Sequence, residues 1–227
     1  MGTILTLTTY VILAALLGES FARFLSLWRA AITLQRFSSF SAKPSPVMVL
    51  KMAGDIFFLT RLLKTNDLLW IGEWLFHSSL LLVSLRHLRY VLVPVPGWVS
   101  FIQPFGLVAG YILPLSLTYI LVMKAGRERG YLPSYNFLLL ILLFTISATG
   151  LLMQTAYRTD VVAAKEFIIG ILAFNPVMLP GGLMFVLHFS LFLLLVISLP
   201  SHIFTAPFVM IEARRHEKAL EKLVHEE

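Results

Sequence analysis

The sequence predicts an all-α integral membrane protein, built as a bundle of five transmembrane helices. Of its 227 residues, 58% are hydrophobic and only 13% are charged, and the mean hydropathy is +0.86. Such a composition excludes a water-soluble globular protein. The apolar residues also gather into five segments of about 20 residues or more, each long enough to cross about 30 Å of hydrocarbon. Segments of this kind must be helical, because lipid offers no hydrogen bonds to an open backbone.

The five predicted spans form one membrane domain, residues 1–227. They cover residues 3–24, 68–93, 101–123, 135–157 and 182–204, and a cytoplasmic amphipathic tail follows over residues 205–227. The first span lacks a basic leading region and exceeds the usual apolar length of a signal peptide, so we expect a retained anchor. Before the second span, DIFFLTRLLKTNDLL is amphipathic and suits the membrane surface or a partner subunit equally well.

The lysines and arginines predict the orientation of the bundle. Of the 18, seven lie in the first connection, three in the third and four in the tail, so fourteen share one side. The other side receives four: Arg86, Arg89, Arg158 and Lys165. Because basic residues mark the cytoplasmic face, we expect an outside N-terminus and a cytoplasmic C-terminus. The net charge of +6 is explained in this way and calls for no nucleic acid.

Four of the six histidines fall in only two of the five spans. His77 and His87 lie in the second span, and His188 and His202 lie in the fifth. These spans run in opposite directions, so His77 and His202 share the cytoplasmic depth while His87 and His188 share the outer depth. The separations along the two helix axes are about 15 Å and about 21 Å. The sequence therefore predicts two pairs of imidazoles, each pair bridging two helices.

Two such pairs suit two bis-histidine haems stacked across the bilayer. Neutral imidazole is a common metal ligand, and helix bundles hold cofactors between side chains on facing helices. The ten-residue spacing of His77 and His87 is about 80° from a one-face repeat, so helix curvature must absorb the difference. The chain has no cysteine. It therefore holds no iron–sulfur cluster by itself, and electrons leaving the haems would pass to another subunit.

Three runs of sequence resemble a known family: FHSSLLLVSLRH, SATGLL and HFSLFLLLVISLPSHIFTAPF. They are similar to the gamma, or cytochrome b, subunit of respiratory nitrate reductase. They are equally similar to the membrane subunits of heterodisulfide reductases and of the sulfite-reduction-associated membrane complex. The resemblance extends from about Asp55 to Pro207, and the connection before the second span is closer to the heterodisulfide-reductase-like branch.

The resemblance implies a di-haem subunit of a respiratory oxidoreductase in a prokaryotic inner membrane. His77 and His202 would bind the inner haem b, and His87 and His188 the outer haem b. The family oxidises a membrane quinol, here expected to be menaquinol from the quinone pool, near the outer haem. Electrons then pass to iron–sulfur subunits on the cytoplasmic side.

The sequence departs from the nitrate reductase pattern around the quinol. Ser79 and Arg86 stand where that branch has glycines near its second-span histidines, and a quinol-binding lysine has no clear match. Arg86 is expected to pair with a haem propionate or to shape the quinol site. Gln103 is the nearest polar candidate for the missing lysine, and Asp160 is an acidic group able to accept a quinol proton.

Two other functions fit a membrane bundle that contains histidines. One is a proton-coupled carrier in which the histidines form a relay, which predicts no haem and a water-filled cavity. The other is a haem-free anchor that holds a respiratory complex to the lipid. Neither explains why the histidines pair by depth.

Overall fold

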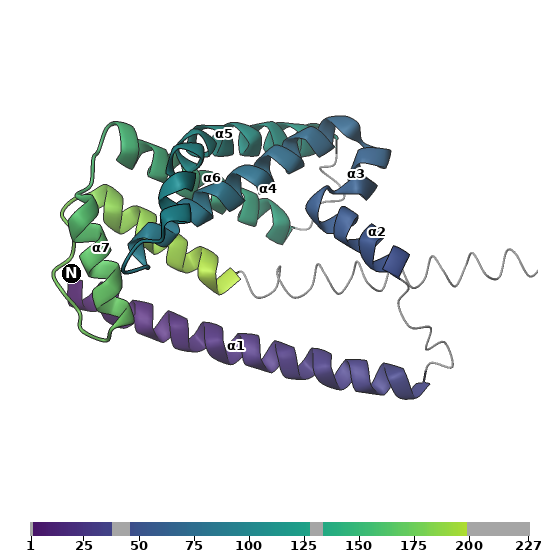
Figure 1. Cartoon of the computed structure of the whole chain (residues 1–227), viewed down its shortest axis with the longest axis horizontal. Helices are drawn as coiled ribbons and strands as arrows, with labels where there is room; N and C mark the ends of the chain where they lie inside the picture. The colour runs from purple at the N-terminus through teal and green to yellow at the C-terminus, as the bar shows by residue number, and fades with distance from the viewer. Residues whose placement is uncertain (1, 38–45, 128–133, 199–227) are drawn as a thin grey trace, which may run out of the picture.

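The computed structural model describes residues 2–37, 46–127 and 134–198, and every regular element within these ranges is helical. The elements are α1 (Gly2–Phe37), α2 (Pro46–Phe57), α3 (Thr60–Thr65), α4 (Asp67–His87), the 3₁₀ turn η1 (Leu88–Tyr90), α5 (Gly97–Arg127), α6 (Ser134–Thr155) and α7 (Val161–Leu172). A last helix, Leu183–Ser198, carries no label in Figure 1 and is drawn there in yellow-green.

Four described helices are long and apolar enough to cross a membrane. Their apolar stretches are Thr3–Arg23 in α1, Asp67–Tyr90 in α4 and η1, Gly97–Gly126 in α5 and Asn136–Thr155 in α6. The chain is thus a helical membrane protein, and these stretches lie within or close to four of the predicted spans. The fifth predicted span, residues 182–204, is described only through Leu183–Ser198, which is shorter. Its remainder lies outside the described residues, so the count of five spans stays a prediction.

The centre of the bundle is the packing of α4, α5 and α6. Its buried apolar residues are Phe76, Leu113, Leu117, Ile120 and Leu140. Helices approach closely in membranes where small residues face a neighbour. Two glycines meet this need between α4 and α5, because a Cβ at Gly72 would lie 2.6 Å from Tyr119 Cδ1 and one at Gly106 would lie 2.7 Å from Arg86 Cβ.

A second core joins α7 to the last helix through phenylalanines. The Phe167 ring lies edge-on to Phe185 at 5.8 Å and to Phe189 at 5.6 Å between ring centroids. From the sequence, residues 158–181 were expected to connect the fourth and fifth spans. Helix α7 nevertheless forms, since Asp160 caps its first turn and the twelve residues that follow are mostly apolar.

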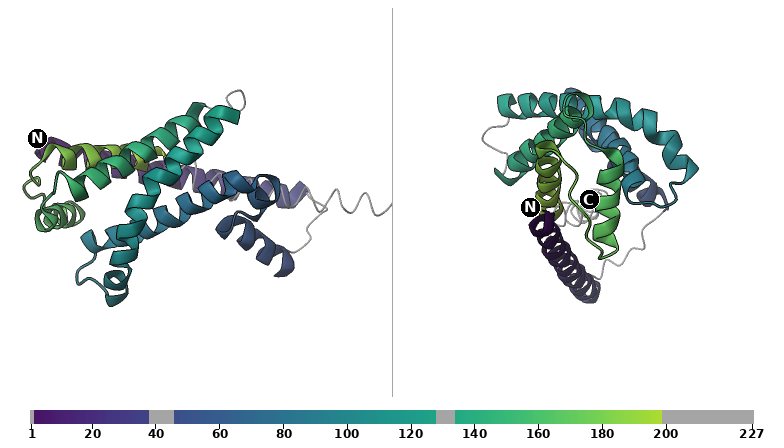
Figure 2. Two further views of the ribbon diagram at one scale, coloured as in Figure 1. Left: turned by 90° about the horizontal axis from the view of Figure 1, so that it is seen from above. Right: turned by 90° about the vertical axis from the view of Figure 1, so that its left-hand side faces the viewer.

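Helix α1 contacts this second core through its first turns. The Tyr10 hydroxyl donates a hydrogen bond to the Ile171 carbonyl at 3.1 Å, and its ring stacks on Phe174 at 5.3 Å. Figures 1 and 2 show the N-terminal end of α1 beside α7 and the rest of α1 diverging from the bundle. Leu17 and Phe21 are accordingly exposed. The start of α1, η1 and α7 therefore gather at one end of the molecule.

The expected amphipathic stretch before the second span is divided among the end of α2, all of α3 and the start of α4. Helix α2 ends at Phe57, and Leu59 takes a left-handed conformation with φ of 50° before α3 begins. The buried Asp55 carboxylate accepts a hydrogen bond from Thr60 and lies 3.5 Å from Arg61 Nε. The Asp55 side chain therefore joins the end of α2 to the start of α3 across the break. This end of the bundle lies opposite α7 (Figure 1).

Candidate functional site

Two of the four membrane histidines lie together, although 101 positions separate them in the sequence. The rings of His87, at the end of α4, and His188, in the second turn of the last helix, have centroids 6.5 Å apart and planes inclined by 21°. His87 is exposed, and His188 is half-buried. These are the residues predicted to form the outer pair, and the fold brings them to the end of the bundle that carries η1 and α7.

The hydrogen bonds of the two rings fix which nitrogen carries the proton. His87 Nδ1 lies 2.7 Å from the Val83 carbonyl, which only accepts, so Nδ1 is the donor. His188 Nδ1 lies 3.0 Å from Thr149 Oγ1. The single hydroxyl proton of Thr149 is directed to the Ile146 carbonyl at 2.9 Å, so Oγ1 accepts from His188 Nδ1. Each imidazole therefore keeps the lone pair on Nε2 for another partner.

This donor set fits a metal held between two imidazoles. A metal–imidazole bond is about 2 Å long, so two axial imidazoles place their ring centroids about 6 Å apart. The observed 6.5 Å agrees with that separation. Histidines that bind metals also commonly donate their other N–H to a carbonyl or a similar acceptor, as both rings do here. The described residues contain no group of three or more His, Asp or Glu that could hold a metal ion, and a bis-histidine haem needs none.

Helix α6 forms the wall behind His188. A Cβ at Gly150 would lie 3.1 Å from His188 Cε1, so the absence of a side chain there allows the ring to approach the helix. Gly150 directly follows Thr149, and the two residues together position the ring. The bond from His188 to Thr149 was not predicted, although a hydroxyl residue beside a glycine in an apolar span is a signal for it.

Of the predicted inner pair, only His77 lies within the described residues. His77 Nδ1 lies 2.7 Å from the Glu73 carbonyl, and the side chain is half-exposed. Its expected partner, His202, lies outside the described residues, so the inner pair stays a prediction. Beside His77, the Glu73 carboxylate forms an ion pair of 2.7 Å with Lys124 on α5. This ion pair was not predicted, and its signal in the sequence is an acidic residue one turn before a histidine in an apolar span.

Next to His87, side chains of α4, η1, α5 and α6 form a network of hydrogen bonds. Arg86 Nη1 donates to Gln154 Oε1 on α6 at 3.1 Å, and Gln154 Nε2 donates to the Tyr111 hydroxyl on α5 at 3.2 Å. Gln103 Nε2 donates to the Arg86 carbonyl at 3.3 Å, and Arg89 Nη1 donates to Gln103 Oε1 at 3.2 Å. The predicted residues Arg86 and Gln103 are thus neighbours, whereas Gln154 was not foreseen.

Asp160, the third residue expected near the quinol, serves the start of α7. Its carboxylate accepts from Val162 N at 2.8 Å and from Ala163 N at 3.3 Å. These bonds satisfy backbone donors that a helix start leaves open. The structure gives Asp160 this capping role, and its part in quinol chemistry stays a prediction.

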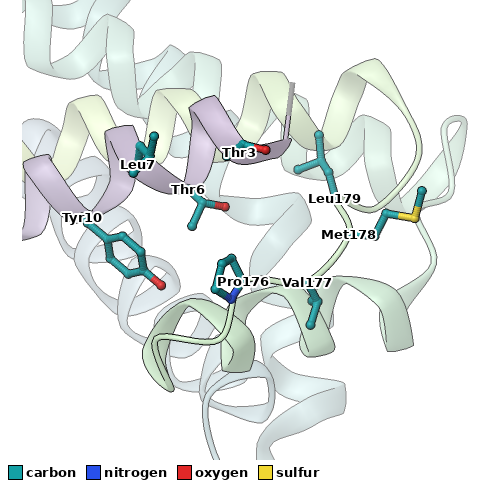
Figure 3. A pocket seen from close by; sticks show the side chains of 8 residues that line it. All are labelled: Thr3, Thr6, Leu7, Tyr10, Pro176, Val177, Met178 and Leu179. Carbon is teal, nitrogen blue, oxygen red and sulfur yellow. The ribbon is translucent and has the colours of Figure 1, made fainter.

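A pocket of about 470 Å³ opens at the same end of the molecule, between the first turns of α1 and the loop after α7. Thr3, Thr6, Leu7 and Tyr10 line one side, and residues 176–179 line the other (Figure 3). The lining is mostly apolar, and none of the site residues predicted from the sequence contributes to it.

Comparisons with known proteins identify relatives in two archaea. Over 150 residues the chain is 33% identical to the Hdr-like menaquinol oxidoreductase cytochrome b-like subunit of Archaeoglobus fulgidus, covering 55% of this chain and 45% of that protein. Over 149 residues it is 28% identical to the protein of the same name from Archaeoglobus profundus, covering 58% and 44%. The chain thus spans less than half the length of the curated relatives it matches.

No family model matches the chain, and no solved structure matches it. The similarity to the two archaeal proteins supports the cytochrome b-like resemblance, and it does so for the Hdr-like branch and not for the nitrate reductase gamma subunit specifically.

Proposed function

We propose that this chain is an electron-transfer subunit of a menaquinol oxidoreductase, and that His87 and His188 would hold a haem b. The observation that carries the proposal is the imidazole pair, with centroids 6.5 Å apart and each Nδ1 already engaged. The names of the two relatives support the electron-transfer role. From the sequence we add a second haem b at the inner depth, between His77 and His202.

The protein's own residues hold and orient the ligands. A haem bound in this way supplies reversible one-electron oxidation and reduction, which a side chain of this cysteine-free chain cannot supply. The Val83 carbonyl and the Thr149 hydroxyl fix the ring orientations of His87 and His188 and raise the basicity of Nε2. The pair lies at one depth because His87 ends α4 and His188 lies in the second turn of the last helix.

Menaquinol oxidation is assigned to the end of the bundle that carries η1 and α7. Arg86 and Gln103 lie there beside His87, and Asp160 caps α7 at the same end. We place this end outside the cell and the opposite end on the cytoplasmic side of a prokaryotic inner membrane, where iron–sulfur subunits would receive the electrons. The distribution of lysine and arginine supports this orientation.

The test is a dithionite-reduced minus oxidised spectrum of the purified full-length chain, with haem quantified as the pyridine haemochrome. We expect two b-type haems per chain. His87→Ala and His188→Ala should each remove the same component, and His77→Ala should remove the other. His225→Ala, in the charged tail, is the matched control and should remove none.

A folded chain that was produced with haem available and yet contains none would refute the proposal. The alternatives would then be a proton-coupled carrier or a haem-free anchor. Loss of different components in His87→Ala and His188→Ala would refute the pairing while leaving a cytochrome.

A further inference from the structure

Two arginines at the outer end have only neutral hydrogen-bond partners in the described part of the chain. Arg86 donates to Gln154, and Arg89 donates to Gln103. Within that part, no carboxylate lies within 4 Å of either guanidinium. Lys124, which lies in α5 beside the same helix, differs because the Glu73 carboxylate pairs with it at 2.7 Å. The positive charge of Arg86 is therefore held in place without being cancelled.

The position of Arg86 links it to both imidazoles of the outer pair. It directly precedes His87 on α4, and its side chain reaches α6 to bond Gln154. Gln154 follows Gly150 by four residues, just over one helical turn or about 6 Å along α6, and Gly150 is the residue that His188 packs against. The guanidinium thus lies about one turn from the place where His188 meets α6.

The surrounding residues are shaped to keep the charge in this position. A Cβ at Gly106 on α5 would lie 2.7 Å from Arg86 Cβ and 3.0 Å from Arg86 Cδ, so only glycine leaves room for the side chain. Gln154 in turn donates to the Tyr111 hydroxyl at 3.2 Å, which orients the amide so that its oxygen faces the guanidinium. An amide in this place accepts the hydrogen bond and adds no negative charge.

We propose that the positive charge of Arg86 raises the reduction potential of the haem that His87 and His188 would hold. This inference rests on the proposed function. Menaquinol would release two protons on the outer side and give up two electrons one at a time. Each electron would convert one ferric iron to ferrous iron, so the haem site would lose one positive charge. A fixed cation nearby stabilises the less positive, reduced form. The effect is large because the low dielectric of the membrane screens the charge weakly.

The proposal is tested by redox titration of the full-length chain in its membranes, following the b-type component that His87→Ala removes. Arg86→Gln removes the charge, Arg86→Lys keeps it, and Gln154→Glu cancels it in place. Arg158→Gln removes an exposed arginine in the connection after α6 and is the matched control. At fixed ambient potential, the reduced-to-oxidised ratio should fall roughly tenfold in Arg86→Gln and Gln154→Glu. For a one-electron couple, a tenfold change corresponds to 59 mV.

Arg86→Lys and Arg158→Gln should keep the ratio within about twofold of the parent, a range well below the tenfold expected for charge loss. An unchanged ratio in both Arg86→Gln and Gln154→Glu would overturn the inference, as would an equal fall in Arg86→Lys. If Arg86→Gln binds no haem, Gln154→Glu decides the matter, because it leaves Arg86 in place. A parent chain without haem would instead refute the proposed function, so the two failures are distinguishable.

Discussion

Replacing Gly106 by alanine should separate α4 from α5 at the outer end of the bundle. The new Cβ would lie 2.7 Å from Arg86 Cβ and 3.0 Å from the Leu82 carbonyl oxygen. Carbon atoms in contact are normally about 3.5 Å apart or more, so the two helices would have to move apart by about 0.8 Å. The carbonyl is backbone, and the Cβ of Arg86 moves only with its helix, so no side-chain rotation relieves the clash.

The cost of this movement can be set against the intrinsic gain of alanine. Forcing extra carbon into a packed interface costs about 1–3 kcal/mol. Alanine is favoured over glycine inside a helix by about 1 kcal/mol, which offsets part of that cost. Gly110, one turn later on the same helix, is the matched control, since a Cβ there meets no atom within 4 Å. Gly110→Ala should therefore be neutral or stabilising, and Gly106→Ala should be less stable than it by about 1–3 kcal/mol.

The assay is equilibrium unfolding of the purified chain in mixed detergent micelles with increasing dodecyl sulfate, comparing the two variants with the parent. Because Arg86 precedes His87, the haem component assigned to His87 should also shift in Gly106→Ala and stay unchanged in Gly110→Ala. Equal unfolding free energies for the two variants would contradict the close approach of α4 and α5 at Gly106.

Three further substitutions test single contacts. Thr149→Val keeps the side-chain shape but removes the acceptor of His188 Nδ1. Haem affinity, measured by haem titration of the chain, should therefore fall about 10–100-fold. Unchanged affinity would contradict the assigned hydrogen bond. Lys124→Met leaves the mostly buried Glu73 carboxylate unpaired and should lower the unfolding free energy by about 3–5 kcal/mol, and adding Glu73→Gln should restore most of it; a double variant as unstable as the single one would argue against the ion pair. Asp160→Ala removes the cap of α7 and should cost about 1 kcal/mol in the same unfolding assay, which Asp160→Ser should largely recover, since serine also caps helices.

Helix existence followed directly from composition, because a run of about 20 apolar residues has few alternatives in lipid. The four stretches suited to spanning a membrane fall in or near the predicted ones. Helix α7 was not predicted, because its twelve residues are too few to cross a membrane and length is what marks a span in the sequence. The break at Leu59 was also missed, because leucine rarely adopts a positive φ and nothing local marks the position.

The proximity of His87 and His188 was predictable from the sequence, whereas the residues around them were not. Antiparallel spans place His87 and His188 at one depth whatever the crossing angle, so depth alone could pair them. The partners of those rings depend on which faces of α4, α6 and the last helix meet, and a single sequence does not contain the crossing geometry. Thr149 and Gln154 are therefore visible only in the structure.

Helices α4 and α5 are fastened to each other at two depths. At the end of the bundle where α4 begins, Lys124 pairs with Glu73, and at the end that carries η1 and α7, Gln103 bonds the Arg86 carbonyl. Two contacts at separate depths prevent the two helices from rotating about one contact point, which a single contact would permit. Electron tunnelling rates fall exponentially with the gap between donor and acceptor. His77 and His87 both lie in α4. If they hold the two proposed haems, a stiff α4–α5 pair would keep the distance between those haems, and so the transfer rate, constant when the surrounding lipid pushes against it.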